Sequence, residues 1–147
     1  MRRMVLILGM LAGCGGGTPV PFAGDYDVTA DTPASCSGVL NFGRVRIPTD
    51  DSQSFQVIYP VFDEGGITWT VIGEAGWTLE GEALHIDAFT HAWPASDPAR
   101  QHWEVDAATF THAADGTITG TWEITRVRTM PDDVATCAYD VVLTPVP

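Results

Sequence analysis

The stretch that decides the fold is Thr109–Trp122, TFTHAADGTITGTW, in which two alternating runs flank Asp115–Gly116. An Asp–Gly dipeptide between such runs is typical of a tight type I′ turn that joins two antiparallel strands. With a two-residue loop, Thr109 faces Trp122 across the hairpin. The apolar residues upstream then fall out of phase, so the pattern predicts either a β-bulge near Ala107–Ala108 or a longer turn.

The same alternation of apolar and polar residues recurs on both sides of this hairpin, whereas no convincing run has the spacing of an amphipathic helix. Thr, Val, Ile and aromatic residues fill these runs, as a half-buried pleated sheet prefers. The alternating positions are Tyr26, Val28 and Ala30; Phe55, Val57, Tyr59 and Val61; Ile67, Trp69 and Val71; Leu84, Ile86 and Ala88; Cys137, Tyr139, Val141 and Leu143. Turn signals separate the runs at Pro48–Asp51, Asp63–Gly66 and Glu80–Glu82.

These patterns predict an all-β fold of about eight strands joined mostly by short connections. Successive antiparallel strands form a meander, and closing a meander removes its two exposed edges. We therefore expect a single antiparallel up-and-down β-barrel, with a two-sheet β-sandwich as the alternative. The segment Ala92–Arg100, which contains two X–Pro pairs, is expected to be a longer loop.

The N-terminus differs in character from the rest of the chain. Met1–Arg3 is basic and Met4–Leu11 is apolar, an order typical of a secretory signal peptide. The apolar run is far shorter than the ~20 residues that span a bilayer. Leu11–Ala12–Gly13–Cys14 resembles the lipobox of bacterial lipoproteins, which implies cleavage before Cys14, acylation of its sulfur and attachment to the cell envelope. In that family Gly15, in place of an Asp after the Cys, favours the outer membrane.

These features divide the chain into three parts. Residues 1–13 are the expected signal peptide, residues 14–22 carry the lipidated Cys14 and a tether, and residues 23–147 form the domain. The tether combines Gly15–Gly17, which is flexible, with two stiffening prolines. Several acyl chains on one Cys anchor a protein stably. Cleavage would leave 134 of the 147 residues, a length that fits one domain with a real core.

Cys36 and Cys137 remain once Cys14 is assigned to lipid. Two cysteines in an exported domain predict one disulfide, with two buried free thiols as the alternative. The bridge would close a loop of 101 residues, for which the chain-entropy model gives about 4–5 kcal/mol of stabilisation. The two ends of the domain should then be neighbours in space.

The chain is strongly acidic and contains no Lys. Loss of Arg2 and Arg3 with the signal peptide would move the formal net charge from −12 to −14. Such a charge excludes nucleic acid as a partner, because phosphate neutralisation needs clustered Lys and Arg. It also opposes adhesion to anionic lipid beyond the anchor. We interpret it as a repulsive, solubilising surface, with attraction of cations or of a basic partner as the alternative.

Metal ligation is the first chemistry that the sequence could support. The histidines are His85, His91, His102 and His112. Five residues separate His85 from His91, which just reaches the spacing of zinc ligands, but no Cys is free to join them. We therefore expect surface or loop histidines and no metal. The acidic pairs Asp50–Asp51, Asp63–Glu64 and Asp132–Asp133 follow no calcium-loop pattern and are expected to be solvated turn residues.

Catalytic motifs are missing from the sequence. There is no Gly-x-Ser-x-Gly elbow, no phosphate-binding glycine loop in the domain and no recognisable triad spacing. We expect a non-enzymatic protein without a cofactor. Trp69, Trp103 and Trp122 lie on apolar strand faces and are expected to fill the core. Trp93, beside a proline in the expected loop, is the best candidate for an exposed contact.

The expected barrel resembles lipocalin-like and other calycin barrels, which carry Gly-x-Trp near the first strand. Gly24–Asp25–Tyr26 stands there in this chain, and Gly120–Thr121–Trp122 lies near the other end. A barrel of this size is either packed solid or holds one small ligand. We expect a lipid-anchored envelope protein that serves as a structural or interaction module. The resemblance implies the alternative, a barrel that binds a small apolar ligand.

Overall fold

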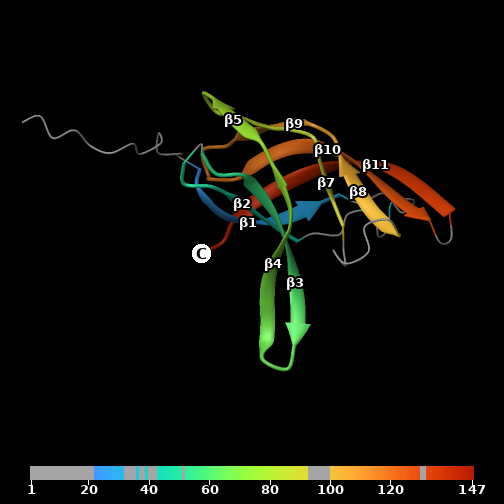
Figure 1. The fold of residues 1–147 in the computed structure, drawn as a ribbon. Coiled ribbons are helices and arrows are strands. Elements are labelled where there is room, and N and C mark those ends of the chain that lie inside the picture. The colour runs from blue at the N-terminus through green and yellow to red at the C-terminus, as the bar shows by residue number, and fades with distance from the viewer. Residues whose placement is uncertain are drawn as a thin grey trace, which may run out of the picture.

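The computed structural model describes residues 22–31, 36, 39, 43–50, 52–92, 100–129 and 132–147. These residues form one antiparallel sheet of eleven strands (Figure 1). The strands are β1 (Gly24–Ala30), β2 (Arg44–Ile47), β3 (Phe55–Asp63), β4 (Gly66–Ala75), β5 (Trp77–Glu80), β6 (Ala83–Ile86), β7 (Phe89–His91), β8 (Gln101–Val105), β9 (Ala108–His112), β10 (Ile118–Thr129) and β11 (Asp132–Pro145). None of the described residues belongs to an apolar helix of membrane-spanning length.

Three pairs of these strands are single bent strands. One or two residues interrupt them, at Gly76 between β4 and β5, at Asp87–Ala88 between β6 and β7, and at Asp106–Ala107 between β8 and β9. Counted this way, eight strands follow one another around the sheet, and the last pairs antiparallel with the first. The predicted up-and-down barrel of about eight strands is confirmed. All the described strands belong to one sheet, so the sandwich alternative is wrong.

The barrel is nearly closed where the bent strand β4/β5 meets β6/β7. The Asp87 N–H donates a hydrogen bond to the Gly76 carbonyl at 2.9 Å. Beyond this bond β4 and β7 are in contact, but no ladder of hydrogen bonds joins them. Gly73 permits this approach, because a Cβ there would lie 2.8 Å from the Cβ of His91 and from a methyl of Val57.

Aromatic side chains fill the centre of the barrel. Trp122 is fully buried, and its ring makes edge contacts with Phe110, Phe55 and Phe89 at centroid distances of 4.9, 6.1 and 6.4 Å. Aromatic pairs in this geometry add to the free energy of burial. The predicted alternation in β11 is confirmed, since Cys137, Tyr139, Val141 and Leu143 are all buried.

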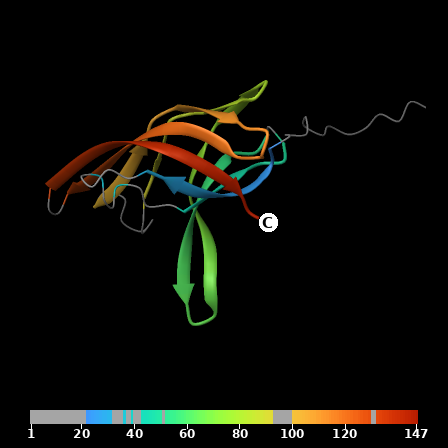
Figure 2. The ribbon, with the colours of Figure 1, turned by 180° about the vertical axis from the view of Figure 1, so that it is seen from behind.

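A disulfide joins the two ends of the domain, as predicted. The Cα atoms of Cys36 and Cys137 are 5.8 Å apart. The Tyr139 hydroxyl donates a hydrogen bond to the Cys36 carbonyl at 3.0 Å and so holds the same segment. Because β11 also pairs with β1, the bridge supports the seam where the first and last strands meet (Figure 2).

The hairpin between β9 and β10 has a three-residue loop, so the expected type I′ turn is wrong. The Ala113 N–H bonds the Thr117 carbonyl at 2.8 Å, and the loop ends on Gly116 at φ +88°. Asp115 favours this longer loop, because its carboxylate accepts the Thr117 N–H at 2.9 Å.

The predicted bulge near Ala107–Ala108 is present as well. Phe110 pairs with Gly120 and Val105 pairs with Ile124. Five steps along one strand therefore match four along the other, which leaves one extra residue between β8 and β9. The longer turn and the β-bulge, which the sequence pattern offered as alternatives, are therefore both present.

Candidate functional site

The most distinctive feature of the molecule is a two-stranded arm, which we define as Ile58–Val71 of β3 and β4. Pairing between β2 and β3 stops at Ile58, whereas β3 and β4 continue to pair up to Asp63 and Gly66. The arm projects away from the barrel in both views (Figures 1 and 2). A tight turn forms its tip, where Asp63 accepts a hydrogen bond from the Gly65 N–H at 2.8 Å.

One side of the arm, the apolar arm face, consists of three successive cross-strand pairs. These are Ile58 with Val71, Pro60 with Trp69, and Phe62 with Ile67. Pairs two residues apart point to the same side of a sheet. Four of the six side chains are substantially exposed: Phe62 at 74%, Ile67 at 58%, Val71 at 41% and Trp69 at 40%. Exposed apolar surface that gathers in one patch is typical of an interaction site.

A β-bulge creates this face. Phe55 pairs with Ala75 and Val57 with Gly73, and these side-chain positions face the barrel interior. The register then shifts between Val57 and Ile58, which leaves Ile72 as an extra residue in β4. A one-residue shift moves every following side chain to the opposite face. The odd-numbered residues of the outer part of β4 therefore point outward.

Arg44 of β2 supports the apolar arm face at its root. Its guanidinium carbon lies 4.0 Å from the centroid of the Trp69 ring. The same guanidinium donates two hydrogen bonds to Asp27, at 2.8 and 2.9 Å. Cation–π contacts at exposed sites contribute about 0.5–1 kcal/mol, so the guanidinium of Arg44 stabilises the Trp69 ring in this position.

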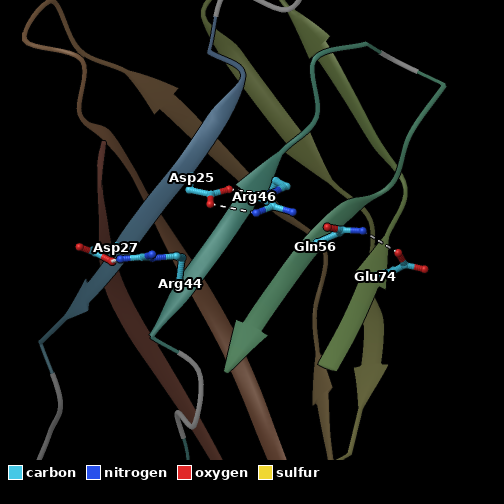
Figure 3. Close-up of polar contacts among 6 residues, drawn as sticks. All are labelled: Asp25, Asp27, Arg44, Arg46, Gln56 and Glu74. Carbon is cyan, nitrogen blue, oxygen red and sulfur yellow. Dashed lines mark hydrogen bonds and ion pairs between the residues drawn. The ribbon is translucent and has the colours of Figure 1, made fainter. Parts of the chain in front are cut away.

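Polar pairs continue across the outer surface next to the arm (Figure 3). Arg46 binds Asp25 through two hydrogen bonds, at 2.6 and 3.0 Å, and Gln56 donates to Glu74 at 2.9 Å. The hydrogen bond from Arg46 lowers the pKa of the Asp25 carboxyl and raises that of Arg46 itself. Exposed ion pairs contribute little stability individually, so this row chiefly fixes the surface around the arm root.

A polar depression of about 440 Å³ lies beside this row. It is lined by Arg46, Pro48, Ser52, Gln53, Ser54, Gln56 and Glu74. Among these side chains, Arg46 binds Asp25, and Gln56 binds Glu74. The depression therefore has the chemistry of a hydrated surface hollow and lacks the apolar lining of a typical ligand pocket.

The histidines do not form a common site. His85 points outward as its strand position predicts, where it bonds Thr109 at 2.8 Å and lies 3.8 Å from Glu80. His102 lies 3.3 Å from Glu104. His91 is the exception to the expected exposure, because it is only 3% exposed and stacks on Trp103 at 5.3 Å. This burial lowers the pKa of His91 to about 4.

The acidic pairs were expected in turns, and the structure places Asp50 and Glu64 there but Asp63, Asp132 and Asp133 at the ends of strands. Asp50 accepts hydrogen bonds from Ser52, and Asp133 binds Arg126 at 2.6 Å. Asp51 lies outside the described residues. Within the described part of the chain, no three His, Cys, Asp or Glu side chains gather closely enough to hold a metal ion.

The tryptophans divide between the core and the arm. Trp122 and Trp103 are buried as predicted. The prediction that Trp69 fills the core is wrong, because the bulge at Ile72 turns its side chain outward. Trp77, which carried no prediction, is also buried and donates a hydrogen bond to the Gln53 carbonyl at 2.8 Å. Trp93 lies outside the described residues.

The expected lipidation site at Leu11–Cys14 also lies outside the described residues. Sequence reasoning missed the arm altogether. The available signal was the length of two runs, Phe55–Asp63 and Gly66–Ala75. Both are far longer than β2, the strand of four residues that lies between β3 and β1 in the sheet. A strand that is longer than its neighbour in the sheet must either pair with another strand or project beyond the sheet.

Comparison with known proteins gives no relative for this chain: no family model, no curated protein and no solved structure matches it.

Proposed function

We propose that this chain is a lipid-anchored protein of the bacterial cell envelope, with the outer membrane favoured, and that its barrel is a non-enzymatic scaffold. The scaffold presents the arm to a protein partner. The single observation that carries this proposal is the exposure of Phe62, Ile67, Trp69 and Val71 on one face of a projecting hairpin. An isolated apolar residue on a surface needs no explanation, but a contiguous group does.

The position of the arm suits an anchored protein. Gly24 begins β1 at the level of Phe55 in β3, and these two strands run in the same direction. The arm tip at Asp63 is eight residues further along β3, or roughly 26 Å at the usual rise per residue. The eight residues from Cys14 to Phe22 span at most about 29 Å. An anchor at Cys14 would therefore be joined to the domain through the root end of the arm, where β1 begins.

The filled interior supports a scaffold over the alternative of an apolar-ligand carrier. A carrier needs an apolar cavity that buries most of its ligand. Here the fully buried Trp122 occupies the centre, with three phenylalanine rings against it. The rigidity of such a packed interior suits a body that must hold an arm in a fixed position.

The anchor is tested by metabolic labelling with an alkyne fatty acid in a bacterium that expresses the full chain. We expect the parent to be labelled and to fractionate with membranes. The variant Cys14→Ser should be unlabelled, whereas a variant without the disulfide, Cys36→Ser with Cys137→Ser, should keep the label. An unlabelled parent that fractionates like Cys14→Ser would refute the anchor.

The interaction role is tested by site-specific photo-cross-linking in the same cells. A photoreactive amino acid at Phe62 should give a discrete adduct with another protein. The same amino acid at Val134, which is 63% exposed on β11, is the matched control and should not. Equal adducts at both positions, or a catalytic turnover abolished by Asp or His substitutions, would contradict a scaffold that acts through its arm.

A further inference from the structure

The two long edges of the arm differ in what they offer to another strand. β4 is the last strand in the hydrogen-bonded order, so among the described residues its segment Gly66–Val71 pairs only with β3. A strand edge of this kind carries N–H and C=O groups that can accept a further strand. The residues between Gly66 and Val71 are Ile, Thr, Trp and Thr, all of which favour the extended conformation.

The opposite edge of the arm belongs to β3, and it contains Pro60. Proline has no N–H and cannot donate to a neighbouring strand, and for this reason natural sheets place it on edges that must not pair. β4 contains no proline. The arm is thus blocked on one side and open on the other, an asymmetry that a hairpin serving only as a spacer does not require.

Charge and apolar surface around the open edge define what can bind there. Asp63 and Glu64 lie at the tip, and Glu74 lies beyond the root on β4, where its carboxylate accepts a hydrogen bond from Gln56 at 2.9 Å. These carboxylates flank a strip whose outward residues are Ile67, Trp69 and Val71. A segment that adds to this strip gains most if its residues alternate, with apolar side chains continuing the apolar arm face and basic ones on the opposite face, where Asp63 of the tip lies beside Thr68.

We propose that the open edge of β4, residues Gly66–Val71, binds an extended segment of a partner protein in which apolar and basic residues alternate, and that this segment adds a strand to the arm. This inference rests on the proposed function and names the chemistry of the partner. Main-chain hydrogen bonds supply the affinity and the alternating side chains supply the selectivity.

Two other occupants fit the surface less well. A second copy brings a formal net charge of −12, or −14 without residues 1–13, against an equal charge, and its two acidic tips repel each other. A bilayer surface with anionic headgroups is repelled by the same charge. In addition, the tip that would enter the interface first carries Asp63 and Glu64. Charge complementarity therefore favours a basic protein segment over either occupant.

The probe is a fluorescein-labelled nonapeptide in which lysine and valine alternate, measured by fluorescence anisotropy against the purified chain. A glutamate–valine peptide tests charge, and a backbone N-methylated lysine–valine peptide tests strand pairing with the side chains unchanged. On the protein side, Val71→Thr alters the arm, and Val134→Thr is the matched substitution of an exposed strand valine elsewhere. Sedimentation of the chain alone and with phosphatidylglycerol vesicles tests the other two occupants.

We expect saturable binding of the lysine–valine peptide and at least about tenfold weaker binding of both control peptides. Val71→Thr should weaken binding several-fold, and Val134→Thr should leave it unchanged. Equal binding of the N-methylated peptide would overturn strand addition while leaving the arm as an interaction surface. Equal effects of the two valine substitutions would overturn the site. A dimer or vesicle binding that Val71→Thr abolishes would replace the basic segment with that occupant.

Discussion

Phe55 and Phe62 lie on the same strand, seven residues apart, and their surroundings could hardly differ more. Phe55 is fully buried against Trp122, whereas Phe62 is 74% exposed near the arm tip. The inner half of β3 has β2 on one side and β4 on the other, but the outer half has only β4 among the described strands. Both halves are rich in aromatic and β-branched residues, so composition alone does not distinguish a core strand from an interaction surface.

This contrast distinguishes apolar surface that stabilises the fold from apolar surface that is left for binding. Burial of a large side chain contributes roughly 1.5–3 kcal/mol to folding. An exposed one leaves the same free energy for binding. We therefore expect barrel substitutions to change the free energy of unfolding, and substitutions on the apolar arm face to change binding while the fold stays intact.

The largest expected effect on the barrel is loss of the disulfide. Replacement of Cys36 and Cys137 by Ser should lower the free energy of unfolding by about 4–5 kcal/mol, because the bridge restricts the unfolded chain over 101 residues. Urea denaturation of the parent and the double variant measures the difference. The parent unfolded in reductant should match the double variant. A difference under about 1 kcal/mol would mean that the β1–β11 ladder alone holds this seam.

Truncation of the two phenylalanines on β3 tests the contrast directly. Phe55→Ala should cost about 3–5 kcal/mol because it opens a cavity beside Trp122. Phe62→Ala should change the free energy of unfolding by less than about 0.5 kcal/mol because its ring is in water. Both are measured by urea denaturation. Equal costs would show that the arm packs against something in the folded molecule, and the division between core and arm would fail.

Acidification should weaken the barrel through His91. Its pKa is about 4 in the fold, below the ordinary value of 6.5, because burial penalises the charged ring. Between these two pH values His91 is protonated in the unfolded chain but neutral in the folded chain. The free energy of unfolding therefore falls as the pH falls from about 6.5 towards 4. The loss is at most about 3 kcal/mol. Urea denaturation from pH 7.5 to 5 should show this slope in the parent, and His91→Gln should flatten it.

The smallest expected effect lies at the arm root. Arg44→Gln removes the cation over Trp69 and the ion pair with Asp27, which together should cost no more than about 1 kcal/mol. The indole should become more mobile, so its fluorescence anisotropy should fall in a chain whose other tryptophans are replaced by phenylalanine. Arg46→Gln, which leaves Trp69 untouched, is the control. Unchanged anisotropy in Arg44→Gln would show that the sheet alone positions the ring.

Much of the barrel was accessible from the sequence, because alternation reports directly on strands. The buried face of β11 was predictable in this way, and the bridge between Cys36 and Cys137 was predictable from the two cysteines of an expected exported domain. The turn at Asp115–Gly116 was located correctly but was one residue too short in the prediction. The longer loop is favoured by the hydrogen bond that the Thr117 N–H donates to the Asp115 carboxylate, which a dipeptide signal does not contain.

The side to which the apolar arm face points was not predictable, for a specific physical reason. Alternation shows that Ile67, Trp69 and Val71 share a face, but it does not say which face the neighbouring strands cover. A single extra residue at Ile72 turned that face from the interior to the outside, and no local signal marks it. The lipid anchor at Cys14 stays a prediction, because it rests on residues that the structure does not describe.

Pro60 has a consequence for stoichiometry. A hairpin with two open edges could take up one strand on each side, and such bivalent units link into chains that grow without limit. In the proposed complex the β3 edge lacks a donor at its middle, so each molecule offers one strand edge of its arm to a partner and not two. In the proposed envelope location, where anchored proteins are crowded on one surface, this proline would favour a one-to-one complex over a fibre.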